Sequence, residues 1–178
     1  DTLGFSLSGT DASSMSINSS SGVLTFNSAP DYETKTSYTA TVTASDGTNS
    51  TAQNIMVNVT NVNDNTPSIT SSATFSVAEN QTAIGTVTAT DADGDTIGFS
   101  LSGTDASSMS INSSSGVLTF NSAPDYETKS SYSATVTASD GTNSTSQTIT
   151  VTIVDVDDVA PAFTSNASFS AAENQTAI

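Results

Sequence analysis

The sequence contains no cysteine, no histidine and no arginine, and its only basic residues are Lys35 and Lys129. Without histidine or cysteine, Ser–His and Cys–His nucleophilic systems cannot form, and no disulfide can stabilise the fold. The chain carries 18 acidic residues and a net charge of −16. Nucleic acid and an anionic membrane surface are excluded as partners, because both require a basic surface. So large a charge repels itself, and high salt or bound cations must offset it.

The chain repeats itself after 94 residues: residues 1–51 return almost unchanged as 95–145, and residues 78–84 return as 172–178. A repeat of this length is the size of a domain, whereas solenoid repeats span roughly 20–50 residues. We therefore expect a piece of a longer array rather than a single domain of 178 residues. Its expected parts are an incomplete unit lacking its first two strands at 1–65, a complete unit at 66–160, and the first strand of a third unit at 161–178.

In the complete unit, apolar residues alternate with Ser and Thr in short runs that are broken by turn residues. There is no helical periodicity. The pattern predicts an all-β fold of tandem, seven-stranded Greek-key β-sandwiches of the immunoglobulin-like type, with the Asp140-Gly141 hairpin between the last two strands. The expected strands are 68–77, 82–90, 97–102, 109–112, 117–121, 132–139 and 144–154.

The acidic residues gather in short motifs that recur with the same period, and only Asp11 and Asp105 fall outside them. In a β-sandwich the connecting loops meet at two poles. We expect Asp91, Asp93 and Asp140 at the pole near the start of the unit. Calcium takes six to eight oxygen ligands from carboxylates, amides and carbonyls, so acids that converge at a pole predict calcium binding. Magnesium is less favoured, because it prefers few protein ligands in a rigid octahedron.

A simpler interpretation is that Asp and Asn merely favour turns. That accounts for Asp140-Gly141 but not for the other motifs taken together.

At the opposite pole we expect Glu79, Asp125 and Glu127, beside the exit segment that contains Asp155, Asp157 and Asp158.

Taken in order, these motifs resemble tandem cadherin repeats over nearly the whole chain. Any one of them is weak, but five in order with a domain-length period are specific. The resemblance implies three calcium ions at each linker, which stiffen the array. The motifs are Ala78-Glu79-Asn80, Asp91-Ala92-Asp93-Gly94-Asp95, Asp125-Tyr126-Glu127, Ala138-Ser139-Asp140-Gly141 and Asn61-Val62-Asn63-Asp64-Asn65-Thr66-Pro67.

The resemblance also implies which residues bind the ions. Asn61 stands where the family pattern has Asp, and Val159 replaces the last Asn of the second linker. The first junction would use Asp31, Glu33, Asn63, Asp64, Asn65, Asp91, Asp93 and Asp140. The second junction would use Glu79, Asp125, Glu127, Asp155, Asp157 and Asp158.

The expected function is mechanical: calcium locks adjacent sandwiches into the rod-like stalk of an extracellular or cell-surface adhesin. The Ser/Thr-rich, cysteine-free composition favours a secreted bacterial source. The expected partners are neighbouring repeats of the same chain. A calcium-dependent module that binds polysaccharide or a sister cadherin-like repeat is the first alternative, and an enzyme is the second. We also expect the first unit to be unstable alone, or to borrow a strand such as 162–178 from another molecule.

Overall fold

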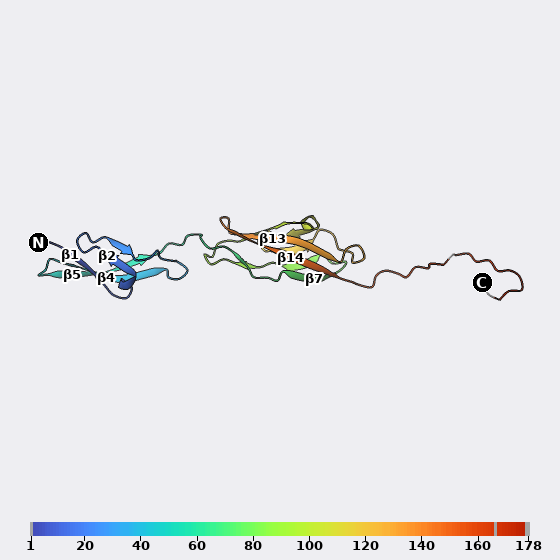
Figure 1. Cartoon of the computed structure of the whole chain (residues 1–178), viewed down its shortest axis with the longest axis horizontal. Helices are drawn as coiled ribbons and strands as arrows, with labels where there is room; N and C mark the ends of the chain where they lie inside the picture. The colour runs from blue at the N-terminus through green and yellow to red at the C-terminus, as the bar shows by residue number, and fades with distance from the viewer. Residues whose placement is uncertain (1, 166, 177–178) are drawn as a thin grey trace.

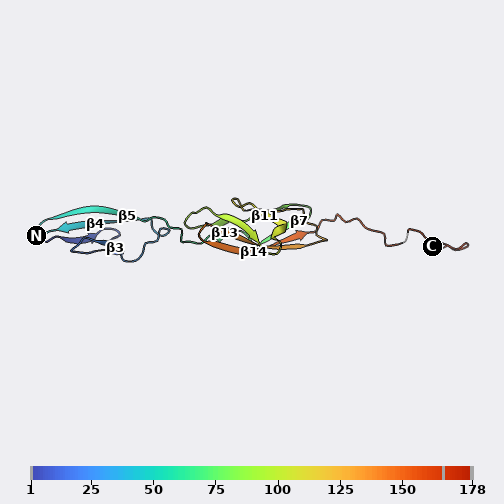
Figure 2. The ribbon, with the colours of Figure 1, turned by 90° about the horizontal axis from the view of Figure 1, so that it is seen from above.

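The chain consists of two β-units that follow one another along its length. The computed structural model describes residues 2–165 and 167–176. The strands of the first unit lie within residues 4–58 and those of the second within 68–154 (Figure 1). A view turned by 90° shows the same end-to-end order (Figure 2). No helix in the described part of the chain is long and apolar enough to cross a membrane.

The first unit has two small sheets, in the orders β1-β4-β5 and β2-β3. All of its strand pairs are antiparallel. A single 3₁₀ turn, η1 (Ala12–Ser14), precedes β2. The strands are β1 (Gly4–Ser8), β2 (Met15–Ile17), β3 (Leu24–Phe26), β4 (Ser37–Ser45) and β5 (Ser50–Asn58).

The second unit adds strands that the first does not have. Its sheets have the orders β10-β13-β14-β7, β11-β12-β8 and β6-β9, and only the β14–β7 pair is parallel. A 3₁₀ turn, η2 (Ala106–Ser108), corresponds to η1. The strands are β6 (Ser68–Ile69), β7 (Thr74–Ala78), β8 (Ala83–Thr86), β9 (Ala89–Thr90), β10 (Gly98–Ser102), β11 (Met109–Ile111), β12 (Val117–Phe120), β13 (Ser131–Ser139) and β14 (Ser144–Val154).

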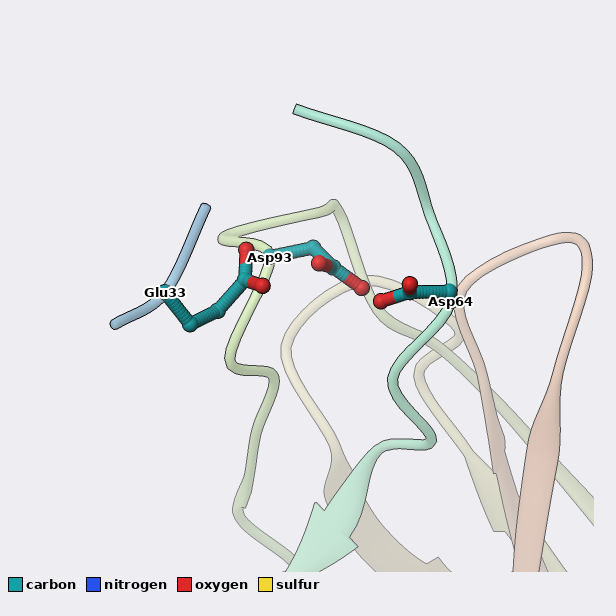
Figure 3. A group of neighbouring side chains, drawn as sticks. All are labelled: Glu33, Asp64 and Asp93. Carbon is teal, nitrogen blue, oxygen red and sulfur yellow. The ribbon is translucent and has the colours of Figure 1, made fainter. Parts of the chain in front are cut away.

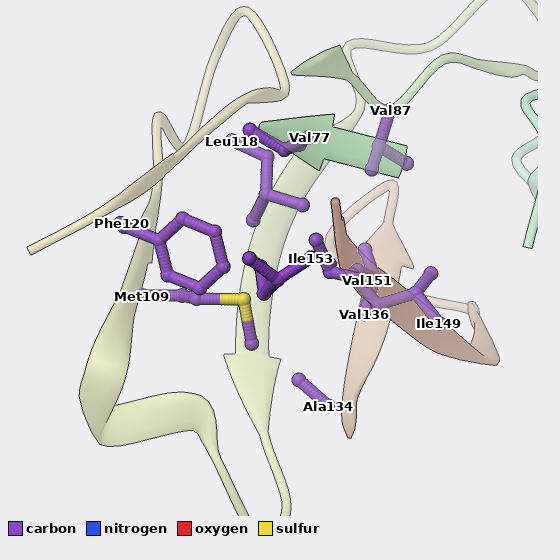
Figure 4. Close-up of a cluster of buried hydrophobic side chains, with 10 residues drawn as sticks. All are labelled: Val77, Val87, Met109, Leu118, Phe120, Ala134, Val136, Ile149, Val151 and Ile153. Carbon is purple, nitrogen blue, oxygen red and sulfur yellow. The ribbon is translucent and has the colours of Figure 1, made fainter. Parts of the chain in front are cut away.

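The core of the second unit lies between its two larger sheets (Figure 4). Alternate residues of β13 and β14 point into it, and the Ser and Thr residues between them point outward, as the period-two pattern predicts. β-branched side chains suit such a half-buried pleated surface. The buried cluster consists of Val77, Val87, Met109, Leu118, Phe120, Ala134, Val136, Ile149, Val151 and Ile153. The expected all-β sandwich is confirmed.

Gly116 lies just before β12, beside the segment that follows β8, where the two backbones approach closely. Its φ is +69°, and a Cβ at this position would lie 2.1 Å from the carbonyl oxygen of Val87. The Val87 N–H donates a hydrogen bond to the Gly116 carbonyl at 2.9 Å, and this bond holds the two backbone segments together. Only glycine combines the positive φ with this close approach.

Side chains at equivalent positions in the two units are buried to different extents. Ile149 on β14 is 1% exposed, but its counterpart Ile55 on β5 is only half-buried. In the second unit β7 pairs with β14 and β8 pairs with β12. In the described residues of the first unit, no strand takes the corresponding places beside β5 and β3.

Two predicted strands are divided, because each contributes to two different sheets. The segment 68–77 forms β6, which pairs with β9, and then β7, which pairs with β14. The segment 82–90 likewise forms β8 and β9. Chains that switch sheets at a corner are common in sandwiches. The other five predicted strands are confirmed to within about two residues at each end, a normal margin for strand boundaries.

The segment 161–178 was expected to form the first strand of a third unit. Residues 161–165 and 167–176 contain no strand, and residues 166 and 177–178 lie outside the described residues, as does Asp1. Its counterparts β6 and β7 are strands because β9 and β14 pair with them. Assignment of this segment to a third unit stays a prediction.

Candidate metal centres

Three carboxylates from three different segments meet between the two units. Glu33 lies in the turn before β4, Asp64 lies in the linker between β5 and β6, and Asp93 follows β9. One carboxylate oxygen from each residue lies within 4.8 Å of the others. Figure 3 shows the three side chains pointing toward one another. The sequence assigned these acids to the first junction, and the structure brings them together.

The linker, residues 61–65, is docked on the second unit through Asp93. The Asn65 N–H donates to Asp93 Oδ2 at 2.9 Å, and Asn65 Nδ2 donates to Asp93 Oδ1 at 3.1 Å. Asn61 Nδ2 donates to the Asp93 carbonyl at 2.8 Å. Asn65 Nδ2 also donates to Asp64 Oδ1 at 3.1 Å. The asparagines therefore hold the linker where its oxygens face the acidic cluster.

Two further acids of this pole each have one carboxylate oxygen that is buried and has no hydrogen-bond donor among the described residues: Asp91 Oδ2 and Asp140 Oδ2. The other oxygen of each is used within its own turn. Asp91 Oδ1 accepts the Asp93 N–H at 3.0 Å, and Asp140 Oδ1 accepts the Asn143 N–H at 2.6 Å. A buried charged oxygen without a donor is costly, and a bound cation would offset that cost.

The opposite pole of the second unit has a second cluster, formed by Glu79, Glu127 and Asp155, again with carboxylate oxygens within 4.8 Å of one another. Glu79 is only 2% exposed. Its Oε2 accepts the Tyr126 N–H at 2.9 Å and its Oε1 accepts the Val156 N–H at 2.7 Å. These two hydrogen bonds fix the Glu79 carboxylate against both the loop before β13 and the exit segment.

The remaining predicted residues lie at the expected poles but outside these clusters. Asp31 and Asp125 each accept the hydroxyl hydrogen of the threonine three residues later, both at 2.9 Å. Asp158 Oδ2 accepts a hydrogen bond from Asn80 Nδ2 at 2.6 Å. Asp157 is exposed. Asn63 Oδ1 accepts a hydrogen bond from Asn143 Nδ2 at 2.9 Å.

Electrostatics at the first cluster show how closely its carboxylates approach one another. The backbone N–H of Glu33 lowers the pKa of its carboxyl, but desolvation and the nearby Asp93 outweigh this and raise the net pKa. Burial raises the pKa of Asp93, but hydrogen bonds from the Asn65 backbone and side chain, together with one from Glu33, leave it below its usual value. The raised pKa of Glu33 and the lowered pKa of Asp93 both reflect the short distance between the two carboxyl groups.

Glu127 is affected in the same way at the second cluster. Its own N–H lowers the pKa, while desolvation and the charges of Glu79 and Asp155 raise it, and the net pKa is raised. Asp140 differs: burial raises its pKa, but the N–H groups of Asn143 and Thr142 outweigh that effect and lower it. A raised carboxyl pKa reflects like charges held close together, and a divalent cation would relieve that repulsion.

Neither lysine offsets the charge of these clusters. Lys35 pairs with Asp11, and Lys129 Nζ lies 2.5 Å from Asp105 Oδ1. Asp11 and Asp105 are the two acids that fell outside the recurring motifs. Both basic side chains of the sequence are therefore used at structural ion pairs, and the carboxylates at the poles have no basic partner among the described residues.

Some participants could not be found from the sequence. Asn80 and Asn143 contact segments nearly 80 residues away, and no local pattern marks such contacts. Asp95 lies in a third acidic group with Asp91 and Asp93. The signal for Asp95 was present in the sequence as a third alternating acid, but we assigned only the first two to the site.

Comparison with known proteins shows which family the chain resembles. Residues 73–154 match the family model of the cadherin domain. Human protocadherin Fat 4 is 34% identical over 171 residues, which are 89% of this chain and 3% of that protein. Human protocadherin Fat 1 is 37% identical over 172 residues, which are 88% of this chain and 4% of that protein. The chain thus spans a small fraction of the length of these relatives.

Solved structures show the same fold. The structure of the protocadherin gammaB7 EC3-6 cis-dimer has a TM-score of 0.76 and 31% sequence identity, and the match covers 88% of this chain and 41% of that chain. Cadherin domains are adhesion modules rather than enzymes, and the matched family therefore offers no support for the catalytic alternative.

Proposed function

We propose that this chain, whose residues 73–154 match the family model of the cadherin domain, is a calcium-binding structural repeat of an extracellular adhesion protein, in which ions bound between consecutive units hold them as a stiff rod. One observation carries the proposal. Buried carboxylate oxygens of Asp91 and Asp140 have no donor among the described residues, and they belong to the pole at which Glu33, Asp64 and Asp93 converge.

The donor set fits calcium. It consists of carboxylate, amide and carbonyl oxygens without nitrogen or sulfur ligands, which is the set that a hard cation prefers. At the first junction the candidate ligands are Asp31, Glu33, Asn63, Asp64, Asn65, Asp91, Asp93 and Asp140. At the second they are Glu79, Asp125, Glu127, Asp155, Asp157 and Asp158.

Calcium would supply positive charge that links carboxylates of different units. Without it, Glu33 of the first unit approaches Asp64 and Asp93 as a like charge, and two unit charges a few ångströms apart repel by about 1 kcal/mol even in water. With it, the same residues attract one another through the ion. The angle between the units then becomes fixed rather than free, which is the mechanical property of a stalk.

Calcium titration by isothermal calorimetry into chelator-stripped protein tests the proposal. Extracellular calcium modules have dissociation constants of about 10⁻⁴–10⁻³ M, and we expect values of this order. At 100 times the dissociation constant a single site stabilises the fold by about 2.7 kcal/mol, which a thermal melt detects. Glu33→Gln and Glu127→Gln should each weaken binding at one cluster.

Glu173→Gln is the matched control, because it removes the same charge from the exposed segment after the second unit. It should bind calcium as the wild type does. The proposal is wrong if calcium produces neither heat nor a melting shift well above this concentration range. Small-angle scattering of the same samples should give a longer and stiffer particle with calcium than in chelator.

A second function, calcium-dependent association between copies of the domain, is favoured by the outer face of the β10-β13-β14-β7 sheet. None of the residues in these four strands is charged. Outward Ser and Thr residues lie in register across it, for example Thr137 opposite both Ser100 and Ser146. Two such faces could meet without the repulsion that the poles would cause. Sedimentation velocity with calcium and with chelator tests for this association.

The expected location at the cell surface follows from the same family relationship and is part of this proposal. The bacterial source suggested by composition stays a prediction, and the relatives reported above are human proteins.

A further inference from the structure

Asn143, in the loop between β13 and β14, connects the second unit to the linker through its side chain. Its Nδ2 donates to Asn63 Oδ1 at 2.9 Å and to the Asn65 carbonyl at 3.0 Å. Its backbone is fixed independently, because its N–H donates to Asp140 Oδ1 at 2.6 Å and its carbonyl accepts the Asp140 N–H at 3.2 Å. The amide therefore projects from a closed loop onto the linker, 78 to 80 residues earlier in the chain.

The linker is held to the second unit at two places. Asn143 holds it from the β13–β14 loop, and Asp93 holds it from the loop after β9, through Asn61 and Asn65. None of these hydrogen bonds involves a metal. Hydrogen bonds to a charged carboxylate, such as those from Asn65 to Asp93, are stronger than neutral ones.

The side of the linker that faces the first unit is different. Within the described residues, no hydrogen bond joins residues 2–60 to residues 61–65. Glu33 is the residue of the first unit that comes close to the linker, and its carboxylate lies near those of Asp64 and Asp93. These like charges repel one another without a cation. The last hydrogen bond of the first unit toward the linker is that of the Val59 N–H to the Thr36 carbonyl at 2.9 Å.

We infer that Asn143 is a positioning residue that holds the linker on the second unit in the absence of any metal, so that the metal-free chain bends before the linker, at residues 59–60, and not within it. This goes beyond the proposed function, because it concerns the metal-free chain. The linker oxygens keep their places beside Asp93 whether or not an ion is present. Any partner at this junction then has to order only the first unit, which lowers the entropic cost of closing it.

Backbone ¹⁵N relaxation of the full chain in chelator tests the inference. In the wild type, residues 63–65 should have order parameters of about 0.85, as in rigid backbone, and the first low values should occur at 59–60. In Asn143→Ala, residues 63 and 64 should fall below about 0.6, the range of flexible segments, whereas residue 65, which Asp93 still holds, should fall less. Asn143→Asp keeps the size of the side chain but removes both amide donors, and it should have the same effect.

Asn49 provides the matched control, because it occupies the equivalent loop of the first unit and its Nδ2 donates to Asp46 Oδ2 at 3.5 Å within that loop. Asn49→Ala should leave residues 63–65 rigid. If the β13–β14 loop itself becomes disordered in Asn143→Ala, the Asn143→Asp variant decides. The inference is overturned if residues 63–65 are flexible in wild-type protein in chelator, or if residues 63 and 64 stay rigid in Asn143→Asp. Because no calcium is added, neither result depends on whether the chain binds it.

Discussion

Glu79 and Val156 lie 77 residues apart in the sequence, yet Glu79 Oε1 accepts the Val156 N–H at 2.7 Å. The second oxygen of Glu79 accepts the Tyr126 N–H at 2.9 Å. One buried carboxylate at the end of β7 thereby fixes both the loop before β13 and the segment that leaves β14. The same carboxylate belongs to the cluster with Glu127 and Asp155, so a residue with a structural role also sets the electrostatics of this pole.

Replacing Glu79 should separate these two roles. Glu79→Ala leaves the N–H groups of Tyr126 and Val156 without acceptors; about 1–3 kcal/mol for each is the upper limit, because that cost applies to fully buried groups and these are only partly buried. Glu79→Gln keeps one acceptor oxygen and removes the negative charge beside Glu127 and Asp155. We therefore expect urea unfolding in chelator to show a large loss of stability for the alanine variant and a smaller loss for the glutamine variant. Equal stabilities for the wild type and the alanine variant would contradict this.

A matched pair of core substitutions should show how differently the cores of the two units are shielded from solvent. Ile149→Ala removes a side chain that is 1% exposed, and such changes cost about 2–5 kcal/mol. Ile55→Ala removes the equivalent, half-buried side chain of the first unit and should cost clearly less, because solvent already reaches it. Unfolding of the two variants in urea, followed by circular dichroism, provides the comparison. Similar losses would mean that β5 is covered in solution as well as β14 is.

The close approach at Gly116 leads to another paired prediction. Gly116→Ala and Gly22→Ala both place a side chain at positive φ, at a cost of about 1–2 kcal/mol. At Gly116 the new Cβ would also meet the backbone carbonyl of Val87 at 2.1 Å, whereas at Gly22 it would meet the ring of Phe5 at 3.3 Å. Gly116→Ala should therefore be the more destabilising of the two in thermal melts. The prediction is wrong if Gly22→Ala melts at the lower temperature.

Strand positions could be predicted from the sequence wherever a strand serves one sheet. The segment 144–154 is an example: Ile149, Val151 and Ile153 alternate with threonines, and β14 has the predicted bounds. The segment 68–77 alternates equally well but is divided into β6 and β7, because the Thr70 N–H bonds to the Thr88 carbonyl and β7 then joins β14. Alternation of apolar and polar residues indicates which side chains face the core, but it does not indicate which sheet a strand joins.

Acidic residues of the site could be predicted because the carboxylates recur with the domain period. The sandwich architecture places Asp93 and Glu127 at their poles, and the resemblance to cadherin repeats assigns Glu33 to the first junction. Asn143 could not be found in this way. The first copy has an asparagine at the same place, Asn49, whose amide stays within its own loop. The role of Asn143 arises from the linker that lies against it, which is a property of the tertiary structure.

The ion pair between Asp105 and Lys129 should make stability depend on pH in a defined direction. The hydrogen bond from Lys129, followed by that of the Ser133 N–H, holds the pKa of Asp105 below its usual value of 3.8. A carboxyl whose pKa is lower in the folded chain than in the unfolded chain stabilises the fold above the unfolded pKa of about 3.9. This stabilisation is lost as the pH falls through the lowered, folded-state pKa.

The difference in unfolding free energy between wild type and Asp105→Asn should therefore be constant near neutral pH and shrink below about pH 4, where the protonated aspartate and asparagine become alike in charge. Urea unfolding in chelator across this range measures it. Asp11→Asn removes the corresponding pair with Lys35 in the first unit, where the pKa of Asp11 is lowered by the same kind of contacts, and it should show the same trend. A difference that grows as the pH falls would mean that Asp105 is protonated more readily in the folded chain, contrary to its contacts with Lys129 and Ser133.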